Sequence, residues 1–405
     1  MKIYPYHHRL FHCIAPSEPK TLFLERIRHD AIIKGQMPLI FLILLMACTG
    51  VTGATERELT FCGTADVSAA VFLDPNHFAV SNDESNLLGI YRISQMNKPC
   101  GILDLNAFLY VDKKFPEADI EAAARAGDRI YWITSHGRNK DGKIRSSRYR
   151  FFAVKIQPPS EGTDPPALVP LGRACNSLIN QWLAYPPTAD LQIDQAVQFN
   201  AKLSKKQQEK LAPKRNGLNI EAMTWLAERR SLLIGLRNPL FKTDAKSAAH
   251  AIAFELLNPE EVIEGKKARF GSILLWDLGN RGLRGMEYDP FRRVHYILAG
   301  PIDAETACAL FVWNGDFQHK PALVFEWPQT EPPFTPEGIA LHPSGQTLWI
   351  FSDDGTLEKP VDSSDQCKDA QLLKNGNCPN KFLLDDRRKT FRVRVYPQPI
   401  ELPQL

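Results

Sequence analysis

The sequence has little charge imbalance and no block of basic residues. Its 49 lysines and arginines nearly balance 46 aspartates and glutamates, which leaves a net charge of +3 on 405 residues. A nucleic-acid-binding surface usually has basic residues gathered on one face, often with aromatic side chains between them. Because no such run occurs, the sequence gives no indication of a nucleic-acid partner.

The common local signatures of catalysis and metal binding are also missing. The sequence contains no G-x-S-x-G, no H-E-x-x-H and no G-x-x-x-x-G-K-[ST], which are typical of serine hydrolases, zinc proteases and P-loop proteins. None of the eight cysteines has a C-x-x-C partner, so a zinc site is not predicted.

A long hydrophobic run occurs in one place, near the N-terminus. Residues 37–54, MPLIFLILLMACTGVTGA, are largely apolar and end in small residues, as the core and cleavage zone of a secretory signal do. The 36 preceding residues are longer than an ordinary basic region. Translation from Met37 and a signal anchor that begins at Met1 therefore both stay open, and we predict a leader over residues 1–54.

The end of this apolar run resembles a bacterial lipobox. Leu45-Met46-Ala47-Cys48 would make Cys48 the lipid acceptor, although methionine is unusual at the second position. The hypotheses are soluble export and attachment through a lipid on Cys48. In either case we expect an exported, periplasmic or cell-envelope protein that meets the membrane only through its leader or that lipid.

Export changes how the remaining cysteines are interpreted, because disulfides form and persist in oxidising compartments. Cys367 and Cys378 bracket a polar stretch with the turn signal Asn375-Gly376. We predict a disulfide between these two cysteines. For the other four, buried thiols and further disulfides are equal alternatives: Cys62, Cys100, Cys175 and Cys308.

Five segments share one pattern, in which small apolar residues precede a polar turn and a second apolar run. They begin near residues 65, 117, 218, 283 and 335. The pattern predicts two strands joined by a tight turn, repeated five times. The segment EAAARA at 121–126 has a helical composition, but it occupies the place of the first strand in this repeat. We therefore expect a strand there.

Further apolar runs after each repeat supply a third and a fourth strand. The fifth repeat lacks a fourth strand, whereas ELTFCG at 58–63 lies before the first repeat without a partner. Four-stranded units in series with such a closing strand predict an all-β propeller over residues 55–405. A long interval near 176–216 indicates a helical insertion in a five-bladed ring, or alternatively a degenerate sixth blade. A two-sheet sandwich is the rival fold, but it does not explain the repeats.

Several motifs resemble an uncharacterised bacterial family, domain of unknown function 3616. They span roughly residues 62–356: EADIEAAA, WITSHGRN, LNIEAM, GLRNPL, LGNRGLRGMEYDP and ILAGP. The resemblance implies a propeller and exported or envelope-associated members, but it implies no activity. The E-G-I-A … SDDG pattern is more loosely similar to phytase-like and gluconolactonase-like propellers. In those proteins a glutamate at the position of Glu337 can hold a divalent cation.

The repeats also predict a ring of acidic residues around the central axis. Its members are Glu121, Glu221, Glu287 and Glu337, with Ser68 as the fifth. Two unit charges 4 Å apart repel by roughly 4 kcal/mol at an effective dielectric constant near 20. The charge could be balanced by Ca²⁺ or Mg²⁺ bound with help from Asp353, by arginines, or by protonation or separation of the carboxyl groups. The candidate arginines are Arg138, Arg237, Arg281 and Arg284.

Two functional hypotheses follow, and the sequence leaves open whether the protein is an enzyme. The first is a cell-envelope binding or scaffold module with a charged channel, whose partner is a small anionic ligand or an envelope protein. The second is a divalent-metal-dependent hydrolase of a phosphoester or lactone-like molecule. In the hydrolase His136 or Asp83 would move the proton, and the anion would be bound by Arg138, Arg237 and Arg284. Without a metal no cofactor is expected.

Overall fold

The computed structural model describes residues 56–159, 165–199, 201–213, 216–244, 247–302, 307–369 and 371–398, with residues 400 and 403. The predicted leader, its apolar core 37–54 and Cys48 lie outside these residues, as does the choice between Met1 and Met37 as the start. No helix in the described part of the chain is long and apolar enough to cross a membrane.

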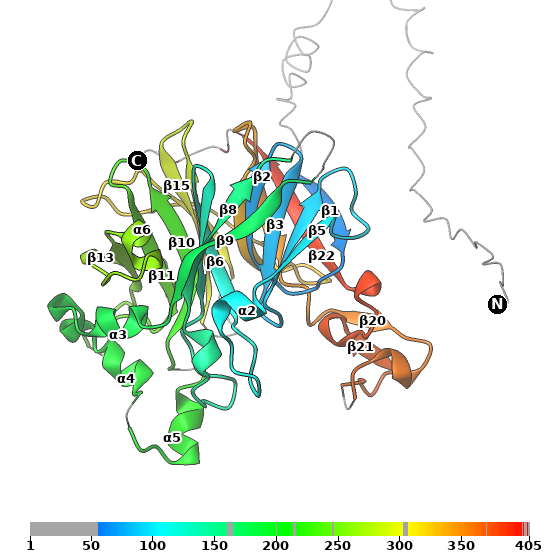
Figure 1. Ribbon diagram of the computed structural model, residues 1–405, viewed down its shortest axis with the longest axis horizontal. Helices are drawn as coiled ribbons and strands as arrows, with labels where there is room; N and C mark the ends of the chain where they lie inside the picture. The colour runs from blue at the N-terminus through cyan, green and yellow to red at the C-terminus, as the bar shows by residue number, and fades with distance from the viewer. Residues whose placement is uncertain are drawn as a thin grey trace, which may run out of the picture. The chain divides into compact units, whose positions relative to one another are not determined.

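Five four-stranded antiparallel sheets form the blades of a propeller (Figure 1). In the first four blades the strands follow chain order from the central axis outward. These strands are β2 (Val67–Asp74), β3 (His77–Asn82), β4 (Leu87–Arg92), β5 (Gly101–Asp104); β6 (Ile120–Ala126), β7 (Arg129–Thr134), β8 (Phe151–Gln157), β9 (Ala167–Cys175); β10 (Asn219–Leu226), β11 (Ser231–Asn238), β12 (Ala251–Leu256), β13 (Phe270–Trp276); β14 (Arg281–Asp289), β15 (Val294–Pro301), β16 (Ala309–Trp313) and β17 (Ala322–Glu326).

The fifth blade closes the ring with a strand from the other end of the chain. It contains β18 (Pro336–Leu341), β19 (Thr347–Ser352), β22 (Thr390–Pro397) and β1 (Arg57–Cys62). Strand β1 pairs antiparallel with β22, so that Arg57 faces Val395 and Cys62 faces Thr390. The predicted propeller and its closing strand at 58–63 are confirmed, and the blade number is five.

The segment with helical composition is the inner strand of the second blade, as the repeat predicted. Strand β6 pairs with β7 up to Ala126, which faces Arg129 across the turn. Gly127 in this turn has a φ of +66°, a conformation that glycine adopts without steric cost. Pairing with β7 and burial of the alanines therefore override the local helical propensity.

Apolar clusters fill the space between each pair of neighbouring blades. Between the first and second blades, for example, Leu88 and Ile90 of β4 pack with Trp132 of β7. The alternation of inward and outward side chains on the strands supplies these layers. Each blade therefore depends on both neighbours for the burial of its faces.

Two insertions depart from the four-stranded pattern. The first, between β9 and β10, holds α3 (Leu178–Leu183), α4 (Ile193–Val197) and α5 (Lys205–Lys210) instead of a sixth blade. Trp182 of α3 stacks on Phe254 of β12 with ring centres 4.0 Å apart. This stacking anchors the helices to the third blade, and the predicted helical insertion near 176–216 is confirmed.

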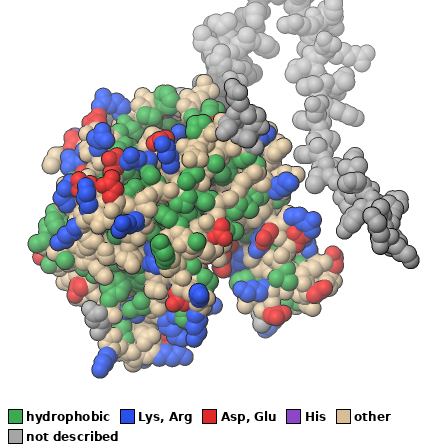
Figure 2. Space-filling model, viewed as in Figure 1, with side chains coloured by type: hydrophobic (Ala, Val, Ile, Leu, Met, Phe, Trp, Pro, Cys, Tyr) green, Lys and Arg blue, Asp and Glu red, His purple; other side chains and the backbone are tan. Residues whose placement is uncertain are grey.

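The second insertion, between β19 and β22, forms a small lobe with β20 (Glu358–Pro360) and β21 (Asn377–Pro379) (Figure 1). Its core contains the predicted disulfide, Cys367–Cys378, which is confirmed, and Leu383. Figure 2 shows basic and acidic side chains interspersed over the lobe and the visible face of the blades. This mixture agrees with the near-neutral net charge of +3.

Candidate functional site

The central channel is lined by the first strand of each blade, and each of these strands has an irregularity near its start. One residue is skipped in the pairing with the second strand, and such a bulge turns its side chain away from the ladder. The skipped residues line one small cavity in the channel: Ser68, Glu121, Glu221, Arg284 and Glu337. The cavity measures about 10 Å³, which is close to the space that one water molecule needs.

The register corrects the predicted ring at one position. Arg284, not Glu287, is the skipped residue of β14, because Leu283 faces Ala299 and Gly285 faces Leu298. Glu287 lies three residues further along and faces Tyr296. The prediction matched glutamate to glutamate between repeats and therefore misaligned the fourth blade.

A different sequence signal marks the ring position. In every blade a small residue follows it: Ala69, Ala122, Ala222, Gly285 and Gly338. At Gly285 an added Cβ would lie 2.9 Å from Ile339 Cγ2 and 3.1 Å from the Glu337 carbonyl oxygen. Neighbouring inner strands therefore approach closely at this level, and only small side chains fit after the bulge.

Arginines neutralise two of the three glutamates in the ring. Arg284 forms an ion pair with Glu337, and its Nη1 lies 3.8 Å from Glu221 Oε2. Arg237 Nη1 donates to Glu221 Oε1 at 2.9 Å, and Asn219 Nδ2 donates to the same oxygen at 2.6 Å. Burial nevertheless raises the pKa of Glu337 to about 7, against the attraction of Arg284. These two glutamates are thus bound within the protein.

The third glutamate of the ring is balanced in another way. Burial raises the pKa of Glu121 well above its usual value, and the carboxylates of Asp119 and Glu221 raise it further. No cation forms an ion pair with Glu121 among the residues that the structure describes. The ring therefore contains two glutamates that face arginines and one whose charged form burial disfavours.

Further acidic residues gather at the end of the channel where the inner strands begin. Asp66 and Asp353 form an isolated bridge between the first and fifth blades. Burial, followed by the nearby Asp353, raises the pKa of Asp66 to about 8. Burial and Asp66 also raise the pKa of Asp83 well above its usual value. Lys381 lowers both pKa values, but its Nζ is bound to Glu84 Oε1 at 2.7 Å.

Asp83 is a buried acceptor within this acidic group. Its Oδ1 has no hydrogen-bond partner in the described part of the molecule. An unsatisfied buried oxygen costs free energy unless the group is protonated or a ligand contacts it. Asp83 Oδ1 therefore remains available to a ligand, because the nearby Lys381 is bound to Glu84.

An arginine that the sequence analysis missed stabilises the second blade at the same end. Arg148 Nη1 donates to Asp119 Oδ2 at 2.7 Å, and Nη2 forms an ion pair with Glu117. Arg148 belongs to the connection between β7 and β8, 29 residues after Asp119. No local pattern joins the two, because their contact depends on how the blade folds.

His136 lies in a buried position beside the helical insertion. The side chain is 1% exposed, its Nδ1 lies 2.9 Å from the Thr134 carbonyl oxygen, and its ring contacts Tyr149 edge to face. Burial lowers the pKa of His136 to about 4, so the ring is neutral at neutral pH. His136 is not among the residues that line the channel cavity, and these contacts favour a structural role.

Arg138 holds the helical insertion in place. Its guanidinium donates to the carbonyl oxygens of Gly142, Val197 and Gln198, each from Nη1 or Nη2 at 2.9 Å. Arg281 is likewise bound away from the ring, with Nη2 2.6 Å from Glu326 Oε1. Of the arginines considered from the sequence, only Arg237 and Arg284 therefore reach the ring glutamates.

The predicted metal ligands do not form a ready coordination site. Among the described residues, no group of three or more His, Cys, Asp or Glu side chains is arranged to hold a metal ion. Glu287 lies outside the ring, and two glutamates of the ring face arginines. Asp353 is in the separate acidic group at the channel end. We therefore derive no reaction step through a bound Ca²⁺ or Mg²⁺.

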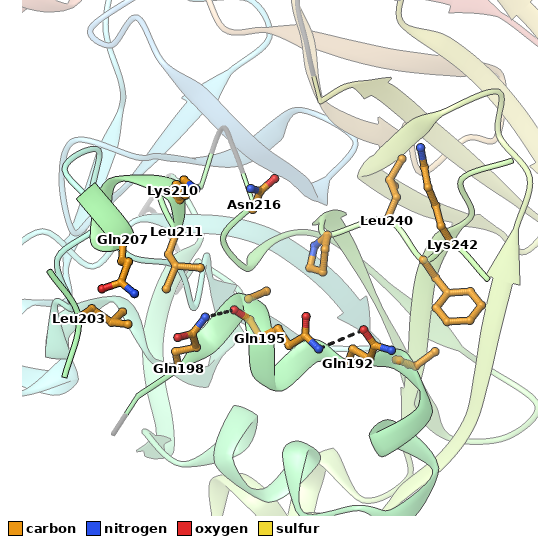
Figure 3. Close-up of a pocket in the computed structure, with 14 residues that line it drawn as sticks. Gln192, Gln195, Gln198, Leu203, Gln207, Lys210, Leu211, Asn216, Leu240 and Lys242 are labelled. Carbon is orange, nitrogen blue, oxygen red and sulfur yellow. Dashed lines mark hydrogen bonds between the residues drawn. The ribbon is translucent and has the colours of Figure 1, made fainter. Parts of the chain in front are cut away.

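A larger pocket lies between the helical insertion and the loop after β11 (Figure 3). It measures about 510 Å³ and is lined by amides, two lysines and an apolar wall. The amides belong to Gln192, Gln195, Gln198, Gln207 and Asn216. Gln195 Nε2 donates to Gln192 Oε1 at 3.1 Å, and Gln198 Nε2 donates to the Gln195 carbonyl oxygen at 2.7 Å. These bonds order the amides along one wall.

Comparisons with known proteins add nothing beyond the fold. No family model and no curated protein matches the chain, so the resemblance to domain of unknown function 3616 stays a prediction. A putative oxidoreductase (glucose dehydrogenase) from Thermus thermophilus is 9% identical, with 84% of this chain and 100% of that chain covered and a TM-score of 0.37. The propeller domain of Cps50 (Swd1) from Myceliophteria thermophila is 10% identical over 84% and 99% of the chains, with a TM-score of 0.30.

Proposed function

We propose that this protein is a binding module of the bacterial cell envelope, and that its recognition face is the channel end at which both insertions lie. The observation that carries this proposal is the position of the insertions. Because antiparallel strands alternate in direction, the β9–β10 and β19–β22 connections both leave their blades where the inner strands begin. Figure 1 shows α3–α5 and the β20–β21 lobe on the same side.

The channel ring supports binding over chemistry. A cavity of about 10 Å³ has no space for an organic substrate. Arg237 holds Glu221 within the third blade, whereas Arg284 of the fourth blade faces Glu337 of the fifth and Glu221 of the third and stabilises the contact between blades. A reaction centre would need groups that remain available to a substrate.

The pocket in Figure 3 gives the recognition face a defined chemistry. Amides offer both donors and acceptors, and the apolar wall around Leu240 can take the flat face of a ring. Lys210 and Lys242 add positive charge at the rim. This combination suits a hydroxyl-rich ligand with an anionic group, and we propose an acidic oligosaccharide.

Isothermal titration of residues 55–405 with trigalacturonate tests this proposal, with neutral maltotriose as the comparison ligand. We expect trigalacturonate to bind more tightly, and Lys242→Ala to weaken it about tenfold or more, because a hydrogen bond to a charged group contributes about 1.5–3 kcal/mol. Lys98→Ala, at an exposed lysine in another blade, is the matched control. Equal binding of both sugars, or no effect of Lys242→Ala, would contradict the proposal.

A divalent-metal-dependent hydrolase is the second candidate, and one observation favours it. Asp66, Asp83 and Asp353 influence one another's charge at the channel end, and Asp83 Oδ1 has no partner among the described residues, although the three side chains are not arranged as a ready coordination site. We expect a stoichiometric Ca²⁺ or Mg²⁺ ion in this case, lost in Asp66→Asn and Asp83→Asn, when purified protein is analysed by plasma mass spectrometry. Metal-free protein with a melting temperature that EDTA does not change would refute this candidate. A bound ion would justify assays with phosphoesters and lactones.

A further inference from the structure

A second cavity lies at the opposite end of the channel, where the inner strands end. It measures about 400 Å³ and receives residues from all five blades. Its lining includes Phe72, Arg125, Trp225, Glu287, Tyr288, Phe291 and His342. Contributions from every blade place the cavity on the propeller axis, away from both insertions.

Glu287, which the register removes from the ring, belongs to this cavity. Its Oε1 accepts a hydrogen bond from the Leu341 backbone N–H at 3.2 Å. No cation forms an ion pair with it in the described ranges, although Arg125 attracts it and Asp289 repels it. Burial is the main reason that the pKa of Glu287 is raised to about 8. Glu287 is half-buried, and its carboxyl group has one long hydrogen bond, so it can still accept a hydrogen bond from a ligand or donate one to it.

Arg125 presents a fixed positive charge to the same cavity. Its Nε donates to the Gly127 carbonyl oxygen at 2.8 Å, and its Nη1 donates to those of Phe72 and Leu73 at 2.6 and 3.1 Å. Nη2 has no protein partner among the residues described. Because three carbonyl oxygens already orient the guanidinium, little side-chain entropy would be lost when it binds an anion.

Aromatic rings form the remaining wall of the cavity. Trp225 and Tyr288 come from neighbouring blades, and Phe291 follows in the turn after β14 with 60% of its surface exposed. The faces of aromatic rings attract cations, most strongly for tryptophan. Together with Glu287 these rings make one part of the cavity suitable for a positive group, while Arg125 makes another suitable for a negative group.

We propose that this cavity binds a small zwitterion, with a substituted ammonium group against the aromatic rings and Glu287 and an anionic oxygen group against Arg125. Arg125 and Glu287 do not neutralise each other by direct contact, so each can engage one end of such a ligand. A ligand with only one charge would leave the other protein group without a partner. This inference is independent of the acidic saccharide proposed for the opposite face.

Isothermal titration with phosphocholine and glycine betaine tests the inference, with choline and inorganic phosphate as single-charge probes. We expect at least one zwitterion to bind about tenfold or more tightly than either single-charge probe. Arg125→Gln should abolish that advantage and leave choline binding unchanged. Glu287→Gln and Phe291→Ala should each weaken both choline and the zwitterion.

The controls separate this site from the rest of the protein. Arg293→Gln removes an exposed arginine that pairs with Glu228 outside the cavity, and it should leave binding unchanged. Lys242→Ala, in the pocket proposed for the saccharide, should also leave zwitterion binding unchanged. The two proposals can therefore be tested and can fail independently. Phe291 is exposed, so its replacement keeps the test valid if a Glu287 variant does not fold. Zwitterions that bind no better than choline or phosphate, or binding insensitive to both Arg125→Gln and Phe291→Ala, would overturn the inference.

Discussion

Charged side chains are paired in the ring near one end of the channel, but they are separated in the cavity at the other end. In the ring, Arg237 and Arg284 contact Glu221 and Glu337 directly, and about 10 Å³ of space remains. At the other end Arg125 and Glu287 share a cavity of about 400 Å³ and form no ion pair. Charges that neutralise each other in a filled space hold blades together, whereas separated charges around an open space can select a ligand. Acidic residues on a propeller axis are therefore not evidence of a metal site by themselves.

The largest expected effect is on stability when the ring loses its arginine. Arg284→Met removes the cation that faces Glu337, and breaking a buried ion pair in this way costs about 3–5 kcal/mol at a pH above 7, where Glu337 is ionised in the native protein. We expect a loss of that size in the free energy of unfolding, measured by urea denaturation. Arg125→Gln at the other end should cost less, because the partners of Arg125 are neutral carbonyl oxygens and its loss leaves no buried charge unpaired.

A double variant sharpens this comparison. Arg284→Met combined with Glu337→Gln removes the uncompensated charge, so it should recover part of the stability that Arg284→Met loses. The losses in the free energy of unfolding of Arg284→Met and Glu337→Gln are measured separately for comparison. If the loss of the double variant equals their sum, lost packing rather than charge explains the effect. Equal losses for Arg284→Met and Arg125→Gln would mean that the two ends do not differ.

The repeats made the architecture accessible from the sequence, but they did not set the register. Five strand-turn-strand segments predicted the number of blades, one unpaired strand predicted the ring closure, and one long interval predicted the helical insertion. Each of these features follows from a local pattern. The prediction placed Glu287 in the ring because it aligned glutamate with glutamate between repeats. The correct alignment follows the small residue after each bulge, which is Gly285 in the fourth blade. The contacts of Arg148, the burial of His136 and the cavity around Arg125 depend on segments that meet only in the folded chain.

A smaller effect should appear in the dependence of stability on pH. Burial raises the pKa of Asp66 and of Glu287 to about 8 and that of Glu337 to about 7, whereas unfolded carboxyl groups have pKa values near 4. The folded state therefore binds more protons than the unfolded state between about pH 4 and pH 8. The stability that these groups contribute is complete below pH 4 and is lost as the pH rises through 7 to 8.

We therefore expect the free energy of unfolding to fall between pH 5 and pH 9, by at least about 1 kcal/mol, in urea titrations at several pH values. Asp66→Asn at one end and Glu287→Gln at the other should each flatten the curve, because an amide cannot ionise. The two ends are expected to differ when ligand is present. Phosphocholine should reduce the contribution of Glu287, because a bound ammonium group stabilises its carboxylate, and should leave that of Asp66 unchanged. A curve that rises with pH, or one that Asp66→Asn and Glu287→Gln leave unaltered, would mean that these carboxyl groups are ionised in the folded protein.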